Sequence, residues 1–356
     1  MLPIPNTPDD VSAAWLSAVM QDSGAIACTI TEIDVSPLGV GLGTLSSMLR
    51  CRPTYDKPRG DEPETVVVKL EPATDAYRES VNTSHGFERE INFYREIAPD
   101  APIRIPTFYF GAFDGRAGAI VLEDLGHLET RNQVHGLGND EVIGAAGHIA
   151  RLHAKYLGRD LSSAHRWMPT HDDRYLGSFT KGWDLFEEVY GLRIGADAVA
   201  LGRRLNDNID WLAAEMASRP QTICHGDFRA DNLLFGEGPH DVTVIDWQLT
   251  QQSLATLDLT RLLGGSEPSP ERRSHPMEAF DAWHAALLQE GVAGYPRDDA
   301  LGDFRLGMLA AVCVPVRLIK AWGVDPGGRQ GQLLDAIATR MFAAAVDIDA
   351  GARLPR

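Results

Sequence analysis

The stretch HGDFRADN (residues 225–232), followed nine residues later by VTVIDW (residues 242–247), decides what this chain is. The nine residues between them, LLFGEGPHD, begin with an apolar run and continue with residues typical of turns. This pattern predicts a hairpin of two antiparallel strands, closed by the pair Phe235 and Val242.

In that register Asn232 lies opposite the end of the second strand, with its Cβ about 5 Å from that of Asp246. An amide oxygen and a carboxylate are ligands that suit Mg²⁺ when substrate phosphates supply the others. Asp227 lies in the loop that enters the hairpin, where its carboxylate could accept the proton of a hydroxyl group. Singly, Asp227, Asp231 and Asn232 would be ordinary turn residues. Asp246, however, ends an apolar strand, where an unpaired carboxylate is costly, so the combination favours a phosphate and metal site.

These residues resemble the His-x-Asp-x-x-x-x-Asn catalytic loop and the metal-binding aspartate of the aminoglycoside phosphotransferase and choline kinase superfamily. That superfamily comprises small-molecule relatives of the protein kinases. The resemblance implies an α+β fold of two lobes, a small antiparallel-sheet N-lobe and a larger helical C-lobe, and it implies ATP and Mg²⁺ as cofactors. It also implies that Asp227 is the catalytic base, that Asn232 and Asp246 hold magnesium, and that His225 braces the loop.

A lysine and a glutamate provide a second indication. The β-branched run over residues 65–70 predicts a strand, and Lys69 lies near its end, where a lone lysine is usually just solvated. A helix is predicted over residues 84–97, and Glu90 falls within its apolar stripe. A carboxylate on the inward face of a helix needs a partner, and Lys69 is the candidate. The resemblance implies that this pair aims the lysine at the α- and β-phosphates.

Gly41 and Gly43 lie between two predicted strands, over residues 30–38 and 46–52. A kinase loop that covers phosphates has this placement, although an ordinary turn explains the glycines equally well. Ser47, just beyond, could bond a phosphate oxygen or simply lie on the strand surface. No G-x-x-x-x-G-K-[ST] run is present in the sequence, which excludes a P-loop mechanism.

Two further strand-like runs, over residues 107–113 and 119–123, lead to the segment 121–126. The resemblance makes this segment the hinge between the lobes, where backbone groups bind adenine. Glu123 and Leu125 are therefore candidate nucleotide-binding residues, through their main chains.

The sequence therefore predicts an N-lobe over residues 1–125, which begins with a helix capped at Thr7. A helical C-lobe over residues 126–356 contains the metal-binding hairpin as a strand-rich island over residues 222–249. The segment 167–190 is rich in aromatic residues, which could line an apolar substrate pocket, although core packing explains them better.

Within the superfamily, the resemblance is closest to the ecdysteroid-kinase-like branch and extends over roughly residues 36–260. It is carried by SSMLR (residues 46–50), FEREINFY (87–94), LEDL (122–125) and DWQ (246–248). This implies a small-molecule hydroxyl substrate: an aminoglycoside, a steroid-like or other lipophilic alcohol, or an amino alcohol.

The composition narrows the partners. Of the 356 residues 44% are hydrophobic, which suffices for a large core, and the net charge of −17 argues against nucleic acid or an anionic membrane surface as partner. The four cysteines form no C-x-x-C pair, which is typical of a reducing compartment. No signal peptide or membrane-spanning run is evident. We therefore expect a cytoplasmic protein, monomeric or homodimeric.

Two alternatives remain open from the sequence. Protein kinase activity is disfavoured because Trp247 and Gln248 replace the Phe-Gly that follows the metal-binding aspartate in protein kinases. A nucleotide-binding regulator without turnover is the other alternative, although all the expected catalytic residues are present. His148 and His153 are five residues apart in a predicted helix and do not share a face, so core or surface positions are expected rather than metal ligation.

Overall fold

The computed structural model describes residues 2–39, 47–71, 85–161, 163–170 and 176–355. The chain divides into two compact units. The N-terminal unit contains Met1–Ala101, Ile105–His127 and Asp246–Leu249, and the C-terminal unit contains Pro102–Arg104, Leu128–Ile245 and Thr250–Arg356.

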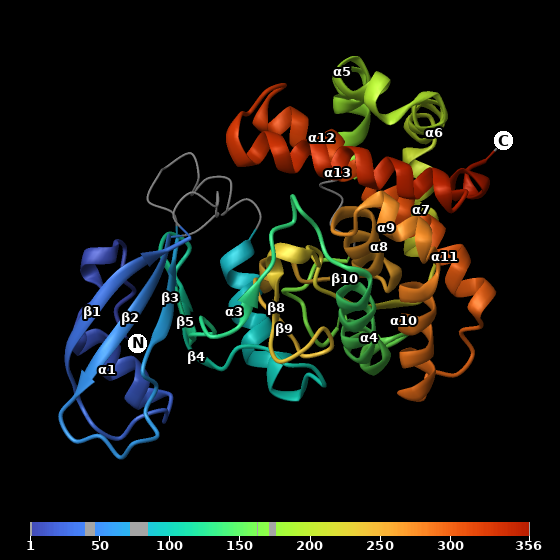
Figure 1. Cartoon of the computed structure of the whole chain (residues 1–356). Coiled ribbons are helices and arrows are strands. Elements are labelled where there is room, and N and C mark those ends of the chain that lie inside the picture. The colour runs from blue at the N-terminus through green and yellow to red at the C-terminus, as the bar shows by residue number, and fades with distance from the viewer. Residues whose placement is uncertain (1, 40–46, 72–84, 162, 171–175, 356) are drawn as a thin grey trace. The chain divides into compact units, whose positions relative to one another are not determined.

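The N-terminal unit is built on a five-stranded antiparallel sheet in the order β1-β2-β3-β5-β4, drawn in blue to green in Figure 1. The two faces of this sheet differ. Val66 and Val68 are fully buried in the core of the unit, whereas Lys69 belongs to the opposite face because successive side chains alternate. The strands are β1 (Ile30–Leu38), β2 (Ser47–Tyr55), β3 (Val66–Leu70), β4 (Phe108–Phe113) and β5 (Gly118–Glu123).

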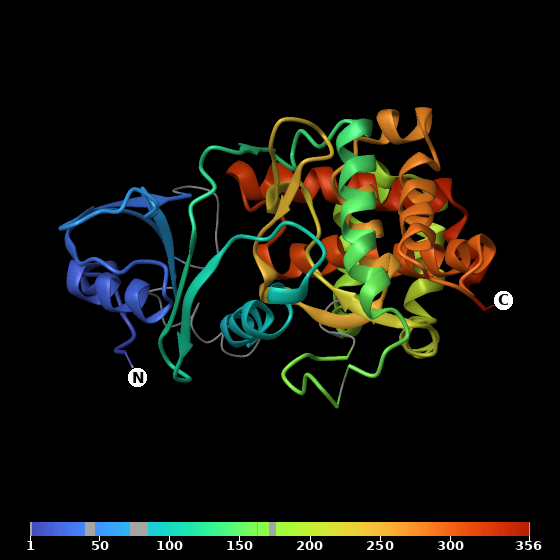
Figure 2. The ribbon, with the colours of Figure 1, turned by 90° about the horizontal axis from the view of Figure 1, so that it is seen from below.

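Helix α1 (Ala13–Asp22) lies against the sheet, as the ribbon in Figure 2 shows from below. Its buried side chains Leu16, Val19 and Met20 belong to the same core as Val66 and Val68. The predicted helix start at Thr7 is wrong for the α-helix. Thr7 begins only a single 3-10 turn, η1 (Pro8–Asp10), closed by its own backbone N–H donating to the Asp10 carboxylate at 2.9 Å. Ser12 caps α1 instead, since its Oγ accepts from the Trp15 N–H.

Helix α3 (Gly86–Glu96) joins a short segment from much later in the chain to the N-terminal unit. The ring of Trp247, in the 3-10 turn η4 (Trp247–Leu249), stacks on Phe93 with centroids 3.8 Å apart. This contact, together with an ion pair of Asp246, explains why residues 246–249 belong to this unit. Residues 246–249 therefore group with the N-terminal unit and residues 222–245 with the C-terminal unit, and the second stretch of the N-terminal unit ends at His127.

The C-terminal unit is mostly helical. Helix α4 packs along α10, and α13 packs on α8 (Figures 1 and 2). Among the described residues, no helix combines the length and apolar character that crossing a bilayer requires. The helices are α4 (Asn139–Tyr156), α5 (Leu176–Ile194), α6 (Ala196–Asn206), α7 (Ile209–Ala217), α8 (Thr256–Gly265), α9 (Ser269–Ser274), α10 (Glu278–Gln289), α11 (Arg297–Ala311), α12 (Cys313–Trp322) and α13 (Gly328–Asp347).

The predicted hairpin register is confirmed. Strands β8 (Leu233–Phe235) and β9 (Val242–Val244) pair with Phe235 opposite Val242. Asn232 precedes β8 and ends the 3-10 turn η3 (Ala230–Asn232). Its carbonyl accepts from the Ile245 N–H at 3.1 Å, which keeps it opposite the end of β9 as predicted. Strand β6 (Glu129–Thr130) extends this sheet, while β7 (Gln221–Cys224) pairs with β10 (Gln251–Leu254).

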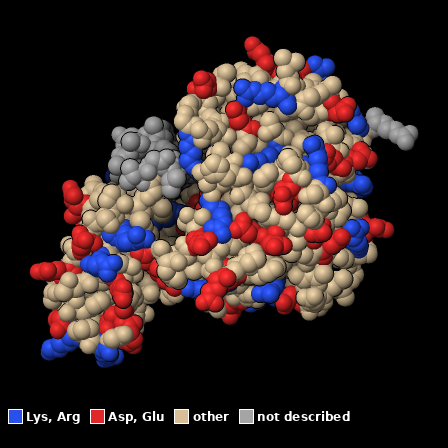
Figure 3. All heavy atoms as spheres, viewed as in Figure 1, with Lys and Arg blue, Asp and Glu red and all other residues tan. Residues whose placement is uncertain are grey.

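The aromatic residues of α5 form core rather than a pocket wall. Phe179, Trp183, Phe186 and Tyr190 are at most 2% exposed and pack with Phe342 of α13. Figure 3 shows acidic and basic side chains interspersed over the visible face, so the net negative charge is not gathered in one patch there.

Candidate active site

The predicted Lys69–Glu90 pair is present in the N-terminal unit. The Lys69 ammonium donates to Glu90 Oε2 at 2.6 Å and also to Asp246 Oδ1 at 2.7 Å. The Lys69 side chain is 7% exposed and that of Glu90 is fully buried, while that of Asp246 is 26% exposed. One cation is therefore shared by a buried carboxylate and by a more accessible one.

Burial raises the pKa of Glu90 above its ordinary value, and the Lys69 charge opposes this. Burial by itself would lower the pKa of Lys69, but the charges of Asp246 and Glu90 outweigh it and raise that pKa. Lys69 is therefore a fixed positive charge at neutral pH. A lysine with rotatable donors held in this way suits a phosphate oxygen.

Asp246 adopts an unusual backbone conformation. Its φ angle is 66°, in the left-handed region that non-glycine residues enter at a cost of about 1–3 kcal/mol. Two contacts of the Asp246 carboxylate offset this conformational cost. Lys69 donates to Oδ1, and the Gln248 amide donates to Oδ2 at 3.2 Å. Such strain is common where a side chain must be aimed for function.

In the segment 121–126, predicted as a hinge, Glu123 uses its side chain locally: its Oε2 accepts from both the backbone N–H and the hydroxyl of Thr107. The Leu125 N–H makes no hydrogen bond within the described part of the chain, so it is available to a ligand. A groove of about 510 Å³ adjoins this segment, and its lining includes the ion-paired Arg50 and Asp124. Its mostly charged and polar lining is unlike an apolar base pocket.

Only part of the predicted glycine loop lies within the residues that the structure describes. Gly41 and Gly43 lie outside the described residues. Ser47 is the first residue of β2, where it pairs with Leu70. Ser47 therefore lies at the start of the strand that follows the glycines, close to where the sequence places it.

In the C-terminal unit, Asp227 has one tethered oxygen and one open oxygen. Its Oδ2 accepts from Arg229 Nε at 2.8 Å and from Asn232 Nδ2 at 3.2 Å. Its Oδ1 has no hydrogen-bond partner among the described residues, and the side chain is 21% exposed. A carboxylate held on one side and open on the other suits a base that must align an incoming hydroxyl group.

Charge keeps this carboxylate ionised. Burial raises the pKa of Asp227, but the charges of Arg229 and Arg261 and the hydrogen bond from Arg229 outweigh burial, so its pKa lies below the ordinary value. Asp227 is thus an acceptor, not a donor, throughout the neutral range.

Each unit offers an oxygen donor of a kind that suits a hard cation. Asn232 donates its amide nitrogen to the Asp227 carbonyl at 2.9 Å, which leaves its Oδ1 free of hydrogen bonds to the described residues. In the other unit, Asp246 keeps a partly exposed carboxylate. Amide and carboxylate oxygens are ligands that Mg²⁺ accepts.

The loop before Asp227 is held by backbone hydrogen bonds. His225 Nδ1 accepts from the Asp227 N–H at 3.1 Å, so its Nε2 donates to the Ile245 carbonyl at 2.9 Å. Gly226 has a φ angle of 82°, a conformation that favours glycine. These contacts give His225 the bracing position that the sequence predicted.

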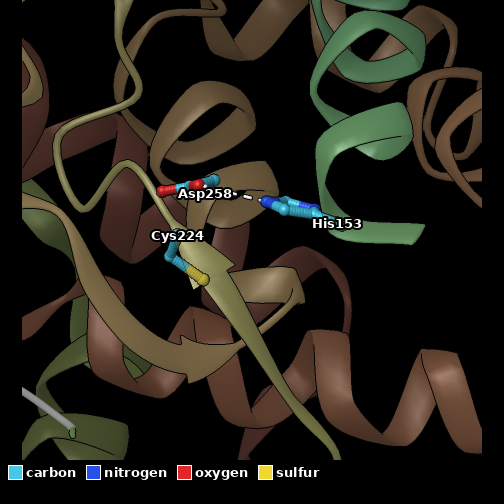
Figure 4. A group of neighbouring side chains, drawn as sticks. All are labelled: His153, Cys224 and Asp258. Atoms are coloured by element: carbon cyan, nitrogen blue, oxygen red, sulfur yellow. Dashed lines mark hydrogen bonds and ion pairs between the residues drawn. The ribbon is translucent and has the colours of Figure 1, made fainter. Parts of the chain in front are cut away.

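A buried aspartate that the sequence did not single out anchors this loop. Asp258 of α8 accepts from the backbone N–H groups of His225 and Gly226, at 2.7 and 2.9 Å. His153 of α4 adds a third contact at 3.2 Å (Figure 4). The other ring nitrogen of His153 accepts from Trp283 at 3.1 Å. Burial raises the pKa of Asp258, but these partners outweigh it and leave the pKa below its ordinary value.

His153, Cys224 and Asp258 lie close enough together to resemble a metal site (Figure 4). Their bonds argue otherwise. Trp283 and Asp258 occupy both nitrogens of His153, and burial raises the pKa of the Cys224 thiol well above its ordinary value, which disfavours the thiolate that metals need. The group is a hydrogen-bonded support.

Sequence reasoning missed Asp258 and the role of Arg229. Asp258 had a usable signal, because it is an acid within the apolar run of α8 and resembles Glu90 in that respect. Arg229 had none, since a charged residue in a polar loop is ordinarily solvated.

Comparison with known proteins agrees with this geometry. Among solved structures, the chain is similar to a protein from Ralstonia eutropha JMP134 provisionally named as an aminoglycoside phosphotransferase (17% identity, 96% of this chain and 98% of that chain covered, TM-score 0.59). It is also similar to the macrolide 2′-phosphotransferase MphH from Brachybacterium faecium (15% identity, 91% and 97% covered, TM-score 0.51). These likenesses establish the two-lobed kinase-like fold.

No curated protein matches the chain in sequence. The model of the ecdysteroid kinase-like family, however, matches residues 41–291, which include both halves of the candidate site. The chain therefore belongs to the ecdysteroid kinase-like family.

Proposed function

We propose that this protein is a kinase that transfers the γ-phosphoryl group of ATP to a hydroxyl group of a small molecule. The observation that carries the proposal is the Asp227 carboxylate, which is ionised and tethered at Oδ2 and has an open Oδ1. Family membership supports the same reaction class.

The N-terminal residues take the nucleotide role in this proposal. Lys69, fixed by Glu90, binds the α- and β-phosphates, while the main chains of Leu125 and Glu123 meet the base. Gly41, Gly43 and Ser47 would cover the phosphates. Glu90 and Asp246 accept two of the three hydrogens of the Lys69 ammonium group, so an arriving phosphate oxygen would bind the third or replace Asp246 as a partner.

Asn232 Oδ1 and the Asp246 carboxylate would hold magnesium. Chain continuity supports this pairing, since Asp246 directly follows Ile245, whose N–H bonds the Asn232 carbonyl. Magnesium held there would offset the negative charge that develops during phosphoryl transfer.

Asp227 performs the acceptor step. Its Oδ1 aligns the hydroxyl group, whose oxygen forms the new bond to the γ-phosphorus as the bond to the ADP oxygen breaks. The hydroxyl proton passes to Asp227 late, which suits a base with a low pKa because transfer of this kind needs little proton abstraction early.

The test is ADP formation from Mg·ATP across aminoglycosides, sterols, amino alcohols and sugars. We expect one class to stimulate turnover, and Asp227→Asn to reduce the stimulated rate by about 10²–10⁴-fold with ATP affinity retained. The exposed Asp207→Asn serves as the matched control and should leave the rate unchanged. Mg·ATP binding without turnover on any acceptor would favour the regulator alternative, and absence of Mg·ATP binding would contradict the kinase assignment.

A further inference from the structure

Arg229 lies at the centre of a charged network beside the proposed base. Its Nε donates to Asp227 Oδ2 at 2.8 Å, and its Nη1 donates both to Gln133 Oε1 at 2.8 Å and to Asp231. The guanidinium group is planar and rigid, so fixing Nη1 also fixes the direction of Nε. The orientation of Asp227, which Asn232 also contacts, therefore depends through Arg229 on Gln133 and Asp231.

Helix α13 supplies the next support. Arg329, in its first turn, donates to Asp231 Oδ2 at 2.7 Å, the oxygen that Arg229 also contacts. The other oxygen, Oδ1, accepts from the Gln133 N–H at 3.0 Å. Asp231 is thus held from two sides and cannot turn away from Arg229 without losing both contacts.

The same helix holds Gln133 as well. Arg340, three turns further along α13, donates to the carbonyls of Gln133 and Val134, both at 2.7 Å. Gln133 is only 2% exposed and also contacts the end of α8 through its amide. Both partners of Arg229 Nη1 are therefore fixed by arginines of α13.

We propose that Arg229 is a positioning residue for the catalytic base, and that helix α13 holds it in place through the Arg329–Asp231 pair. This inference rests on the proposed function, because it assigns Arg229 a role through Asp227. Arg229 keeps Oδ2 occupied and directs Oδ1 outward, so that one oxygen alone meets the acceptor hydroxyl group.

The kinetic test compares Arg229→Met, Arg329→Met and the double variant. A misdirected reacting group costs up to about 10²-fold, so Arg229→Met should lower kcat by roughly that factor while the KM for ATP stays near its original value. Arg329→Met should lower kcat less. Because Arg329 acts through Arg229, the double variant should match Arg229→Met alone.

Two further experiments distinguish the loss of positioning from a general loss of structure. Added guanidinium, below concentrations that unfold the protein, should restore part of the turnover of Arg229→Ala. Arg193→Met, which removes an arginine from an exposed pair on α5, should change nothing. Additive effects in the double variant, or an unchanged kcat in Arg229→Met, would overturn the proposal.

The last arm does not depend on an acceptor. A crystal structure of Arg229→Met should show the Asp227 carboxylate rotated from its present orientation, and an unchanged orientation would overturn the inference. Absence of acceptor turnover in the unmodified protein would instead contradict the proposed function, and the crystal structure alone would then decide this inference.

Discussion

Each unit contributes to the candidate site a cation that lies between two carboxylates, and the two arrangements differ in burial. In the N-terminal unit Lys69 bridges Glu90 and Asp246, and the lysine and Glu90 are almost completely enclosed. In the C-terminal unit Arg229 bridges two aspartates that are 15% and 21% exposed. The first arrangement fixes a charge, and the second orients a group that a substrate must reach.

The choice of cation follows from this difference. A lysine ammonium is a compact charge with rotatable donors, so Lys69 can keep Glu90 and exchange a second partner. An arginine has a rigid fork, so Arg229 transmits orientation from Asp231 to Asp227. Exchanging or removing these cations should therefore affect stability most in the first unit and geometry most in the second.

The largest expected effect on stability is that of Lys69→Met. It leaves Glu90 buried without its counter-charge, and breaking a buried pair in this way costs about 3–5 kcal/mol. Chemical denaturation should show this loss. The control is Lys181→Met, at an exposed lysine, and its free energy of unfolding should be close to that of the unmodified protein. An equal loss in both variants would mean that the enclosed pair is unimportant for stability.

A smaller effect is expected for Asp258→Asn. Both oxygens of Asp258 accept backbone N–H groups, and an asparagine has only one oxygen to offer, so one buried donor is lost at about 1–3 kcal/mol. The folded pKa of Asp258 lies below the ordinary value of 3.8, so its ionised form stabilises the fold above that pH, and the contribution is lost as the pH falls through the folded pKa.

Denaturation of both proteins across pH measures this directly. The unmodified protein and Asp258→Asn should differ most in free energy of unfolding at pH 7, and this difference should decrease below about pH 4. A difference that does not change with pH would show that the charge of Asp258 is not what holds the loop.

The smallest effect is expected for Arg193→Met. Its ion pair with Asp335 is more than half exposed on both sides, and such pairs contribute about 0–1 kcal/mol, less in salt. Thermal melting at low and at high ionic strength should show little difference in melting temperature between Arg193→Met and the unmodified protein. A loss comparable to that of Lys69→Met would remove the distinction between enclosed and exposed cations.

Much of the active-site skeleton could be predicted from the sequence. The turn residues between Phe235 and Val242 fix the closing pair of the hairpin, and the register follows from it. Glu90 was recognisable because an acid on an apolar helix stripe demands a partner, and the partner is the expected Lys69.

The rest depends on contacts that leave no local signal. Asp246 belongs to the N-terminal unit because of Lys69 and because Trp247 stacks on Phe93, a contact between residues far apart in sequence. The partners of Asp258 are backbone groups, which every residue carries. The N-terminal helix was misplaced because two capping signals, at Thr7 and Ser12, compete within a few residues.

The most direct test of the central claim follows the phosphoryl group itself. Mg·ATP labelled in the γ-phosphate is incubated with an acceptor that stimulates turnover, and the label is located after separation of the products. The account predicts that the label is on a hydroxyl group of the acceptor, in proportion to ADP formed, and that Asp227→Asn slows this transfer by about 10²–10⁴-fold. Label found only in inorganic phosphate would contradict it.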